Sequence, residues 1–487
     1  MKKYLIILFT LILLILSLGV IDILSPSFSI LGRDSKIIPH NVKNFLKEKV
    51  FFIPAKLQKA DLLEIKLKIK EDMYLDAKES NIFIYNNLIE LIDDQKLTLF
   101  HKRQIKSKKN IDYELSVFKI PLLEYYVFED KPIAYLEAYN NNLITATGDG
   151  FFFRSTIDNN KIDIKNFKKI KSNIHSFKEY SDIRNPGWLS IKDIKFYEND
   201  IFLSITEEVK KNCFNLSILQ SDINDLKEFE FKKIYNMEQC TSSDVNEFLG
   251  WQSGGRIEFY KDHILLTVGD FRNRSHPQNE KSLFGKLLAI NLETNETLII
   301  SKGHRNQQGL LVDGNIIVST EHGPAGGDEI NIHRNVFNQM KIPNYGWPEA
   351  SYGVHYQKVL NLNNEKGTYE DLIKIAPLKK SHKENGFIEP IKYFAPGSVA
   401  ASEIEKSNKV FDKNFTNDFY FGVLRNNLKY RGRLYHFKFD NKFEQIIFED
   451  EIILKERIRD IVIPKNSENM YLLLESIPAI GVVKLLK

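Results

Sequence analysis

Cysteine is scarce in this chain: Cys213 and Cys240 are the only two among 487 residues. So few cysteines exclude a disulfide-rich scaffold. Neither has a second ligand at zinc-finger spacing, so a structural zinc site is also excluded. In an exported chain the two could form one disulfide, and two buried free thiols are the alternative.

The chain also lacks a large excess of charge of either sign. Its 68 basic and 64 acidic side chains leave a formal net charge of +4, which gives no indication of a nucleic-acid partner. The lysine-rich stretch at residues 101–109 has acidic neighbours, so a solvated surface is the simpler interpretation. With 43% hydrophobic residues, the chain can bury a large core and is long enough for more than one unit.

Long hydrophobic runs are missing except at the N-terminus. Two lysines precede an apolar run at residues 4–20, which continues to residue 24. No small-x-small cleavage site follows, so residues 1–24 are predicted to be an uncleaved signal-anchor, with a cleaved signal peptide as the alternative. The positive flank would stay in the cytoplasm. The rest of the chain would then be exported, to the periplasm or the extracytoplasmic face of the membrane.

Residues 25–131 contain no recognisable motif and are predicted to form a separate region, either a small α+β domain or a membrane-proximal spacer. From residue 132 onward the chain has short apolar runs separated by turn residues. These runs lie at residues 133–139, 143–146, 150–154, 201–205, 264–268, 287–291, 316–320, 419–424, 434–439, 458–463 and 471–474. They predict an all-β sandwich, barrel or propeller. The region 132–487 is too long for one sandwich, and its hairpin-like pairs favour propeller blades.

One irregular loop lies at residues 321–331, with the sequence EHGPAGGDEIN, and is followed by NYGWP at residues 344–348. Its three glycines and one proline exclude the interior of a helix or strand. The loop offers two adjacent carboxylates, a histidine and several backbone carbonyls, a set that suits a hard cation such as calcium. A purely structural turn is the alternative.

This loop, together with GHRNQQGL at residues 303–310, resembles the signature of the glucose/sorbosone dehydrogenase family, which includes soluble-type quinoproteins that use pyrroloquinoline quinone (PQQ). The resemblance covers residues 187–487 and is strongest from residue 253 to residue 348. It implies a six-bladed β-propeller with the cofactor at one end of the central channel. The implied reaction is oxidation of an aldose or a related hydroxyl compound, with electrons passed to an acceptor outside the cytoplasm.

The resemblance also assigns residues to the cofactor. Arg305 and Asn306 match the family's Arg-Asn-x-x-Gly motif, and Arg457 and Arg459 match a late arginine pair. PQQ carries three carboxylates, which the planar guanidinium recognises in a bidentate manner. Arg425 stands where the family usually has a lysine over the cofactor, so the charge is kept while the geometry changes. The alternative for the late pair is a strand with outward-facing charges.

A calcium ion is also implied by the resemblance. Gly323 and Pro324 match the residues whose backbone carbonyls hold the cofactor calcium. A calcium that bridges the quinone oxygens would make the ring more electrophilic toward hydride. A further calcium site, or a brace for the loop, is expected from Asp328, Glu329 and Tyr345.

One position departs from the family pattern. The family's catalytic base is a histidine just before a Gly-Gly-Arg turn, and the corresponding residues here are Trp251 and Gln252. An indole nitrogen only donates, and an amide has no useful basicity. Gln252 and Asp270 are therefore the candidate catalytic residues, with Asp270 as a substitute base if it reaches the channel. The alternative function is a non-catalytic propeller that binds a ligand or protein.

Overall fold

The computed structural model describes residues 96–120, 134–148, 150–158, 160–177, 190–244, 248–355, 373–374, 376–395, 399–414, 418–424 and 432–486. The chain divides into two compact units, Met1–Asp76 and Ala77–Lys487, and every described residue belongs to the second unit. The expected signal-anchor at residues 1–24 lies outside the described residues. Within the described ranges, no helix is long and apolar enough to cross a membrane.

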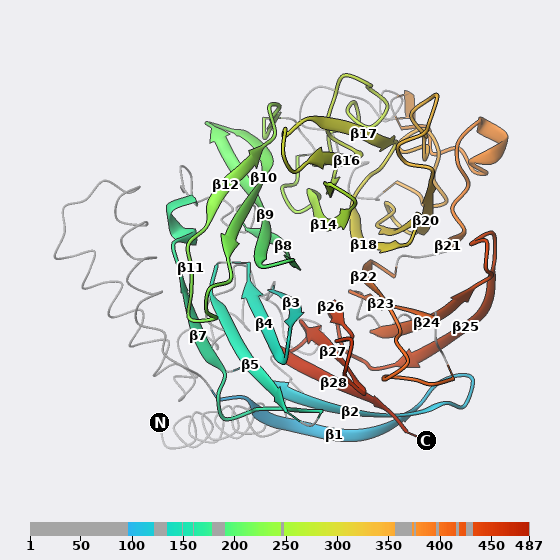
Figure 1. The fold of residues 1–487 in the computed structure, drawn as a ribbon. Coiled ribbons are helices and arrows are strands. Elements are labelled where there is room, and N and C mark those ends of the chain that lie inside the picture. Colours follow the sequence, from blue (N-terminus) through green and yellow to red (C-terminus); the bar gives the residue numbers. More distant parts are fainter. Residues whose placement is uncertain are drawn as a thin grey trace, which may run out of the picture. The chain divides into compact units, whose positions relative to one another are not determined.

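The second unit is a six-bladed β-propeller, as Figure 1 shows. The first sheet contains β3 (Ala134–Tyr139), β4 (Asn142–Thr147), β5 (Phe152–Asp158), β7 (Lys168–Ser172) and β11 (Glu228–Phe229), with β6 (Lys161–Ile162) paired to β5. The second contains β8 (Ile191–Tyr197), β9 (Asp200–Lys210), β10 (Cys213–Asp222) and β12 (Lys232–Asn236), with β13 (Thr241–Ser242) paired to β10. The third contains β14 (Gly254–Tyr260), β15 (His263–Val268), β16 (Lys286–Asn291) and β17 (Thr297–Lys302).

The remaining three sheets complete the ring. The fourth contains β18 (Gln307–Asp313), β19 (Ile316–Glu321), β20 (Asp328–Arg334) and β21 (Lys392–Phe394). The fifth contains β22 (Ala401–Lys406), β23 (Asp418–Val423), β24 (Arg433–Phe439) and β25 (Ile446–Ile453). The sixth contains β26 (Ile458–Val462), β27 (Asn469–Leu474), β28 (Ala479–Leu485), β2 (Asp112–Lys119) and β1 (Thr98–Lys106). Two short 3₁₀ helices, η4 (Ile174–Phe177) and η7 (Lys383–Asn385), lie between strands.

The innermost strands β3, β8, β14, β18, β22 and β26 contact one another in a ring around the axis. Each predicted apolar run of the sequence coincides with one of the observed strands. The all-β prediction is therefore confirmed, and the number of blades agrees with the family resemblance. The disulfide between Cys213 and Cys240 is present and ties β10 to the segment before β13.

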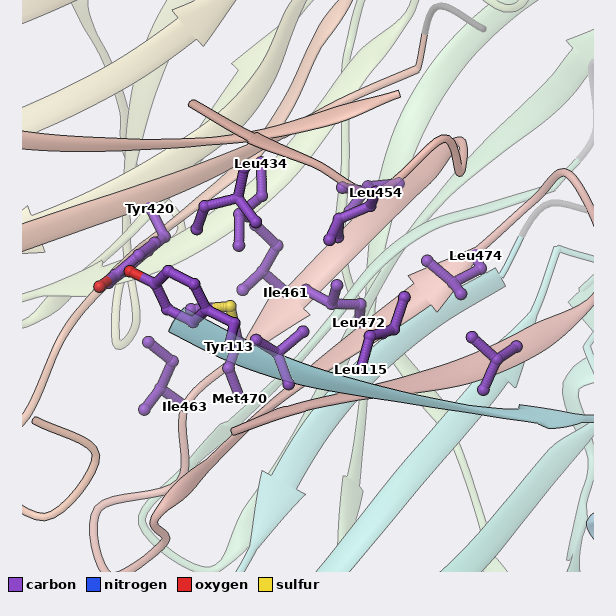
Figure 2. Close-up of a cluster of buried hydrophobic side chains, with 14 of the residues drawn as sticks. Tyr113, Leu115, Tyr420, Leu434, Leu454, Ile461, Ile463, Met470, Leu472 and Leu474 are labelled. Carbon is purple, nitrogen blue, oxygen red and sulfur yellow. The ribbon is translucent and has the colours of Figure 1, made fainter. Parts of the chain in front are cut away.

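The sixth sheet combines the last strands of the chain with two strands from its N-terminal side. β2 pairs with β28 from Tyr113 opposite Leu485 to Lys119 opposite Ala479. Figure 2 shows Tyr113 in the same buried cluster as Met470. Residues 98–119 are therefore part of the propeller, whereas the sequence placed them in the separate region 25–131. Alternating burial along β2 makes it a normal half-buried strand that covers the edge of β28.

A single buried arginine on β14, Arg256, lies at the axis of the propeller. Its Nη1 atom is 3.0 Å from Asp193 Oδ1, 2.7 Å from Glu403 Oε2 and 2.9 Å from Asp460 Oδ1. These carboxylates come from β8, β22 and β26. One guanidinium therefore holds three other blades, through charge-assisted hydrogen bonds to Asp193 and Asp460 and an ion pair with Glu403, and such hydrogen bonds are stronger than neutral ones.

The same guanidinium reaches the two blades that remain. Its Nε atom donates to the carbonyl oxygen of Gln308 at 2.8 Å, and Nη2 donates to that of Arg459 at 3.1 Å. Its Cζ atom lies 5.0 Å from the centre of the Tyr135 ring, at a cation–π distance. Since Gln308 belongs to β18 and Tyr135 to β3, Arg256 contacts all six sheets.

Replacing Arg256 by methionine should leave several buried carboxyl groups without a compensating charge. We expect the R256M variant to lose about 3–5 kcal/mol of unfolding free energy, measured by urea denaturation. The matched control is R334M, which removes an exposed arginine and should change stability by less than about 0.5 kcal/mol. Equal effects of the two substitutions would contradict the central role of Arg256.

Two of the carboxyl groups around Arg256 should also make stability depend on pH. Burial, opposed by Arg256 but assisted by Asp460, raises the pKa of Asp193 and of Glu403 into the neutral range. The folded state then binds more protons than the unfolded state above about pH 4, so stability falls as pH rises through the raised pKa values. We expect these two groups to lower the unfolding free energy by at least about 1.4 kcal/mol between pH 6 and pH 9, against an opposite contribution from Lys286, whose pKa burial lowers to about 7.

The control for this pH dependence is E403Q, whose amide cannot lose a proton in this range. In urea denaturation its decrease in stability between pH 6 and pH 9 should be smaller than that of the unmodified chain. The same change in stability between pH 6 and pH 9 in E403Q and in the unmodified chain would contradict the interpretation.

Candidate functional site

Three of the arginines predicted to bind a cofactor gather around one residue, His322. Arg305 Nη1 donates to the backbone carbonyl of His322 at 3.0 Å. Burial, together with the charges of Arg305, Arg459 and Arg457, lowers the pKa of the His322 ring to about 3, although the backbone of Ala401 opposes this shift. The ring is therefore neutral and lies within the combined field of three cations.

A buried carboxylate holds two of these arginines together. Glu475 accepts from Arg457 Nε at 2.6 Å through one oxygen and from Arg459 Nε at 2.5 Å through the other. Burial opposes ionisation of Glu475, but the two guanidinium charges outweigh it and lower its pKa. Arg459 is buried, so the alternative of a strand with outward-facing charges does not apply to it. No sequence motif pointed to Glu475, because it lies on the far end of the β26–β27 hairpin.

A second set of hydrogen bonds links Arg459 to Asn306. Arg459 Nη1 donates to Gln308 Oε1 at 3.2 Å, and Gln308 Nε2 donates to Asn306 Oδ1 at 3.1 Å. The backbone N–H of Gly254 donates to the same oxygen at 3.0 Å. The arginine pair before and within β26 and the Arg-Asn pair before β18 therefore belong to one connected network.

The Gly-Gly-Arg turn can donate the hydrogen bond from its first backbone N–H to Asn306 Oδ1 only because that first residue is glycine. Gly254 has φ +66°, and a Cβ atom there would lie 2.8 Å from the carbonyl oxygen of Thr267 and 2.9 Å from the backbone nitrogen of Gly269. Since an L side chain is disfavoured in this conformation, the fold fixes the direction of the Gly254 N–H.

Asp270, the expected substitute base, instead supports an aromatic ring. Its Oδ2 accepts from Trp347 Nε1 at 2.8 Å, and its Oδ1 accepts from the backbone N–H of Arg272 at 2.8 Å. The side chain is fully buried. Arg305 and Arg274 both lie 5.5 Å from the centre of the Trp347 ring. Asp270 therefore positions the tryptophan against Arg305 and does not present an oxygen at an exposed surface.

Gln252, the other candidate catalytic residue, lies two residues before Gly254, whose N–H contacts Asn306. Its side-chain Oε1 is buried and has no hydrogen-bond partner among the residues that the structure describes. A buried amide oxygen without a partner is costly unless a ligand or water supplies a donor. Gln252 can therefore accept a hydrogen bond from a ligand, but it cannot remove a proton.

The irregular loop is shorter than the sequence predicted, because Glu321 ends β19 and Asp328–Asn331 begin β20. Asp328 braces the loop that remains, residues 322–327. Its Oδ1 accepts from the backbone N–H of Gly323 at 2.9 Å, and its Oδ2 accepts from those of Val399 and Ala400 at 2.6 and 2.9 Å. Three backbone donors occupy this carboxylate, so Asp328 ties the loop after β19 to the start of β22.

The side chains of Glu329 and Tyr345 contact other protein groups. Glu329 lies 3.4 Å from His382 Nε2 and accepts from Asn331 Nδ2 at 3.2 Å, and its pKa is raised well above the ordinary value, chiefly by burial. The Tyr345 hydroxyl donates to the carbonyl of Ile332 at 2.8 Å. Across the described ranges, no group of three or more His, Cys, Asp or Glu side chains is arranged to hold a metal ion. These contacts favour the brace over a further calcium site.

Two other predicted residues remain to be placed. Pro324 packs against Gly353 at the turn of the irregular loop, where a Cβ atom on Gly353 would lie 2.7 Å from Pro324 Cγ. Arg425 lies outside the described residues.

The fold and site define a propeller with an arginine-rich site beside its axis, and comparisons with known proteins give the family. The sequence profile of the "Glucose / Sorbosone dehydrogenase" family matches residues 156–479. The chain therefore belongs to this family.

Individual relatives agree with this assignment. The aldose sugar dehydrogenase of Escherichia coli is 34% identical over 119 residues, which are 21% of this chain and 30% of that protein. An uncharacterized protein of Synechocystis is 26% identical over 238 residues, which are 44% of this chain and 51% of that protein. The chain thus spans about half or less of the curated relatives that it matches.

Solved structures show the same fold at low identity. A glucose dehydrogenase has a TM-score of 0.57 at 18% identity, with 80% of this chain and 99% of that chain covered. The apo form of the soluble aldose sugar dehydrogenase from Escherichia coli has a TM-score of 0.53 at 18% identity, with 79% and 99% covered.

The bond between Asp270 and Trp347 can be tested by a double-mutant cycle. D270N removes the charged acceptor, W347F removes the donor, and the double variant removes both. We expect a coupling free energy of about 1.5–3 kcal/mol, the usual contribution of a hydrogen bond to a charged group, measured by urea denaturation. Additive effects would show that Asp270 does not position Trp347.

Proposed function

We propose that this chain is a PQQ- and calcium-dependent oxidoreductase that oxidises an aldose or a related hydroxyl compound. The observation that carries the proposal is the group of three arginines, Arg305, Arg457 and Arg459, around the neutral ring of His322. Glu475 pairs with two of these arginines, and three guanidinium groups are the kind of set that recognises an anion with several carboxylates.

The side chains of the site fit a ligand of this kind. Gln252 Oε1 is buried and has no hydrogen-bond partner within the described part of the chain. The guanidinium groups match the carboxylates of a quinone, whereas Gln252 Oε1 needs a donor, which a hydroxyl group of the substrate would supply. The backbone carbonyls of Gly323 and Pro324 would hold the calcium ion in this proposal.

The roles of the residues follow from their contacts. Arg305, Arg457 and Arg459 would bind the cofactor's carboxylates, and Asn306 would orient the site through its link to Gln308. Bound PQQ supplies an acceptor for a hydride from the substrate. Arg425, at the position of the family's lysine, would add a further positive charge.

The comparisons support the substrate class. The chain belongs to the glucose/sorbosone dehydrogenase family, and one matched relative is named an aldose sugar dehydrogenase. The predicted signal-anchor supports a place on the extracytoplasmic side of the membrane, where the electron acceptor would also lie.

A non-catalytic propeller that binds a ligand is the second candidate, and one observation favours it. Neither Gln252 nor the enclosed Asp270 offers a base that a substrate hydroxyl can reach. A positioned general base typically contributes about 10²–10⁴-fold in rate. The proposal therefore includes slow turnover in the unmodified chain.

Restoring the missing base tests the proposal. The full chain and the Q252H variant would be loaded with PQQ and calcium, and reduction of a redox dye would be measured with a panel of aldoses. We expect Q252H to reduce the dye at least about 10-fold faster, because a histidine can accept the hydroxyl proton. Q252N is the matched control and should give no increase. No dye reduction by any of the three, with any aldose, would favour the non-catalytic propeller.

A further inference from the structure

The motif at residues 344–348 is held by a segment that no motif pointed to, the loop at residues 269–285 between β15 and β16. In this loop Gln278 makes a two-way amide pair with Asn344. Its Oε1 accepts from Asn344 Nδ2 at 2.7 Å, and its Nε2 donates to Asn344 Oδ1 at 3.0 Å. The same Nε2 donates to the backbone carbonyl of Trp347 at 2.8 Å. One side chain therefore contacts both the first residue of the motif and its tryptophan.

Backbone partners fix the direction of this amide pair. The backbone N–H of Gly346 can only donate, and it lies 3.0 Å from Asn344 Oδ1, so that atom must be the oxygen. The backbone carbonyl of Trp347 can only accept, so the Gln278 atom beside it must be the nitrogen. The two assignments agree with each other. Neither amide can turn over without placing like atoms face to face.

The amide pair can form only because Gly303 has no side chain. Gly303 has φ +79°, and a Cβ atom there would overlap Asn344 Oδ1 and lie 3.1 Å from Gln278 Nε2. The backbone carbonyl of Gly303 also accepts from the N–H of Trp347 at 3.0 Å. Since Gly303 begins the motif at residues 303–310, the amide pair packs one motif of the family directly against the other.

The ring of Trp347 is held by the start of the same loop. Asp270 Oδ2 accepts from Trp347 Nε1 at 2.8 Å, and the backbone N–H of Asp270 donates to the carbonyl of Arg305 at 2.9 Å. The guanidinium of Arg305 lies 5.5 Å from the centre of the ring, at a cation–π distance. Gln278 thus fixes the backbone of the tryptophan and Asp270 fixes its ring. Together they set the surface against which Arg305 packs.

We propose that Gln278 is a positioning residue, which holds the Trp347 ring against the guanidinium of Arg305 through its amide pair with Asn344. This inference rests on the proposed function, in which Arg305 binds a carboxylate of the cofactor. A guanidinium that is already oriented loses less conformational freedom when an anion binds. Gln278 therefore contributes to cofactor affinity through Trp347 and Arg305.

The position of Trp347 can be measured without any cofactor. The chain has three tryptophans, so the full chain labelled with ¹⁵N-tryptophan gives three indole N–H signals, and W347F identifies that of Trp347. Q278M keeps the length of the side chain but removes its three hydrogen bonds. We expect Q278M to shift the Trp347 signal, because the bond to Asp270 changes its geometry, and to leave the other two signals in place. An unchanged Trp347 signal would overturn the proposal.

The matched control is N215L, in the second blade. Asn215 Nδ2 also donates to a side-chain amide, that of Asn236 at 3.0 Å, and to a backbone carbonyl, that of Met237 at 2.7 Å. N215L therefore removes a similar set of hydrogen bonds without touching the turn at residues 344–348, and it should leave the Trp347 signal unchanged. A shift of the same size in both variants would mean a general loss of stability and would count against a specific role of Gln278.

The consequence for the cofactor can be measured by PQQ affinity at a fixed calcium concentration. Q278M should bind PQQ at least about 10-fold more weakly, the loss expected if a misplaced Arg305 gives up one hydrogen bond to a charged group. N215L should bind within about 3-fold of the unmodified chain, since its substitution lies on another blade.

The two measurements separate this inference from the proposed function. If the unmodified chain binds no PQQ, the proposed function fails, and the Trp347 signal alone then decides whether Gln278 positions the ring. If the unmodified chain binds PQQ and Q278M binds it equally well, the proposed function stands and the positioning role is overturned. If Q278M and N215L lose the same affinity, the positioning role is again overturned.

Discussion

The structure depends on the burial of one positive charge at the axis of the propeller. Arg256 contacts carboxylates of three other blades, backbone carbonyls of two blades and the ring of Tyr135 on β3. A buried guanidinium is tolerated only when its donors are satisfied and its charge is compensated. Six sheets that meet at an axis have little apolar volume there, so a polar centre holds the blades in register while the apolar cores lie between neighbouring blades.

The arginine-rich site also depends on the buried charge of Arg256. Arg256 holds the backbone of Arg459 and Gln308, and the side chains of these two residues continue the network to Asn306. The arginines proposed to bind the cofactor are thus positioned by inner strands that the axial charge fixes, and Glu475 keeps two of them together. A site supported in this way is preorganised, which reduces the cost of bringing several like charges together before an anion binds.

The sequence predicted the parts of this arrangement that are local. Short apolar runs predicted the strands, and the motif residues Asn306 and Arg459 lie in one hydrogen-bond network through Gln308. It could not predict contacts between distant segments. The pairing of β2 with β28 joins residues more than 350 positions apart, and Glu475 meets its arginines across a hairpin. The shortest strands, such as β11 and β13, have two residues each and carry no periodicity that a sequence pattern could reveal.

The central claim is that the arginines around His322 bind PQQ, and a crystal structure of the full chain grown with PQQ and calcium tests it most directly. The account predicts quinone carboxylates within hydrogen-bonding distance of Arg305, Arg457 and Arg459. A quinone bound elsewhere on the propeller, or this site without the quinone at saturating concentration, would contradict it.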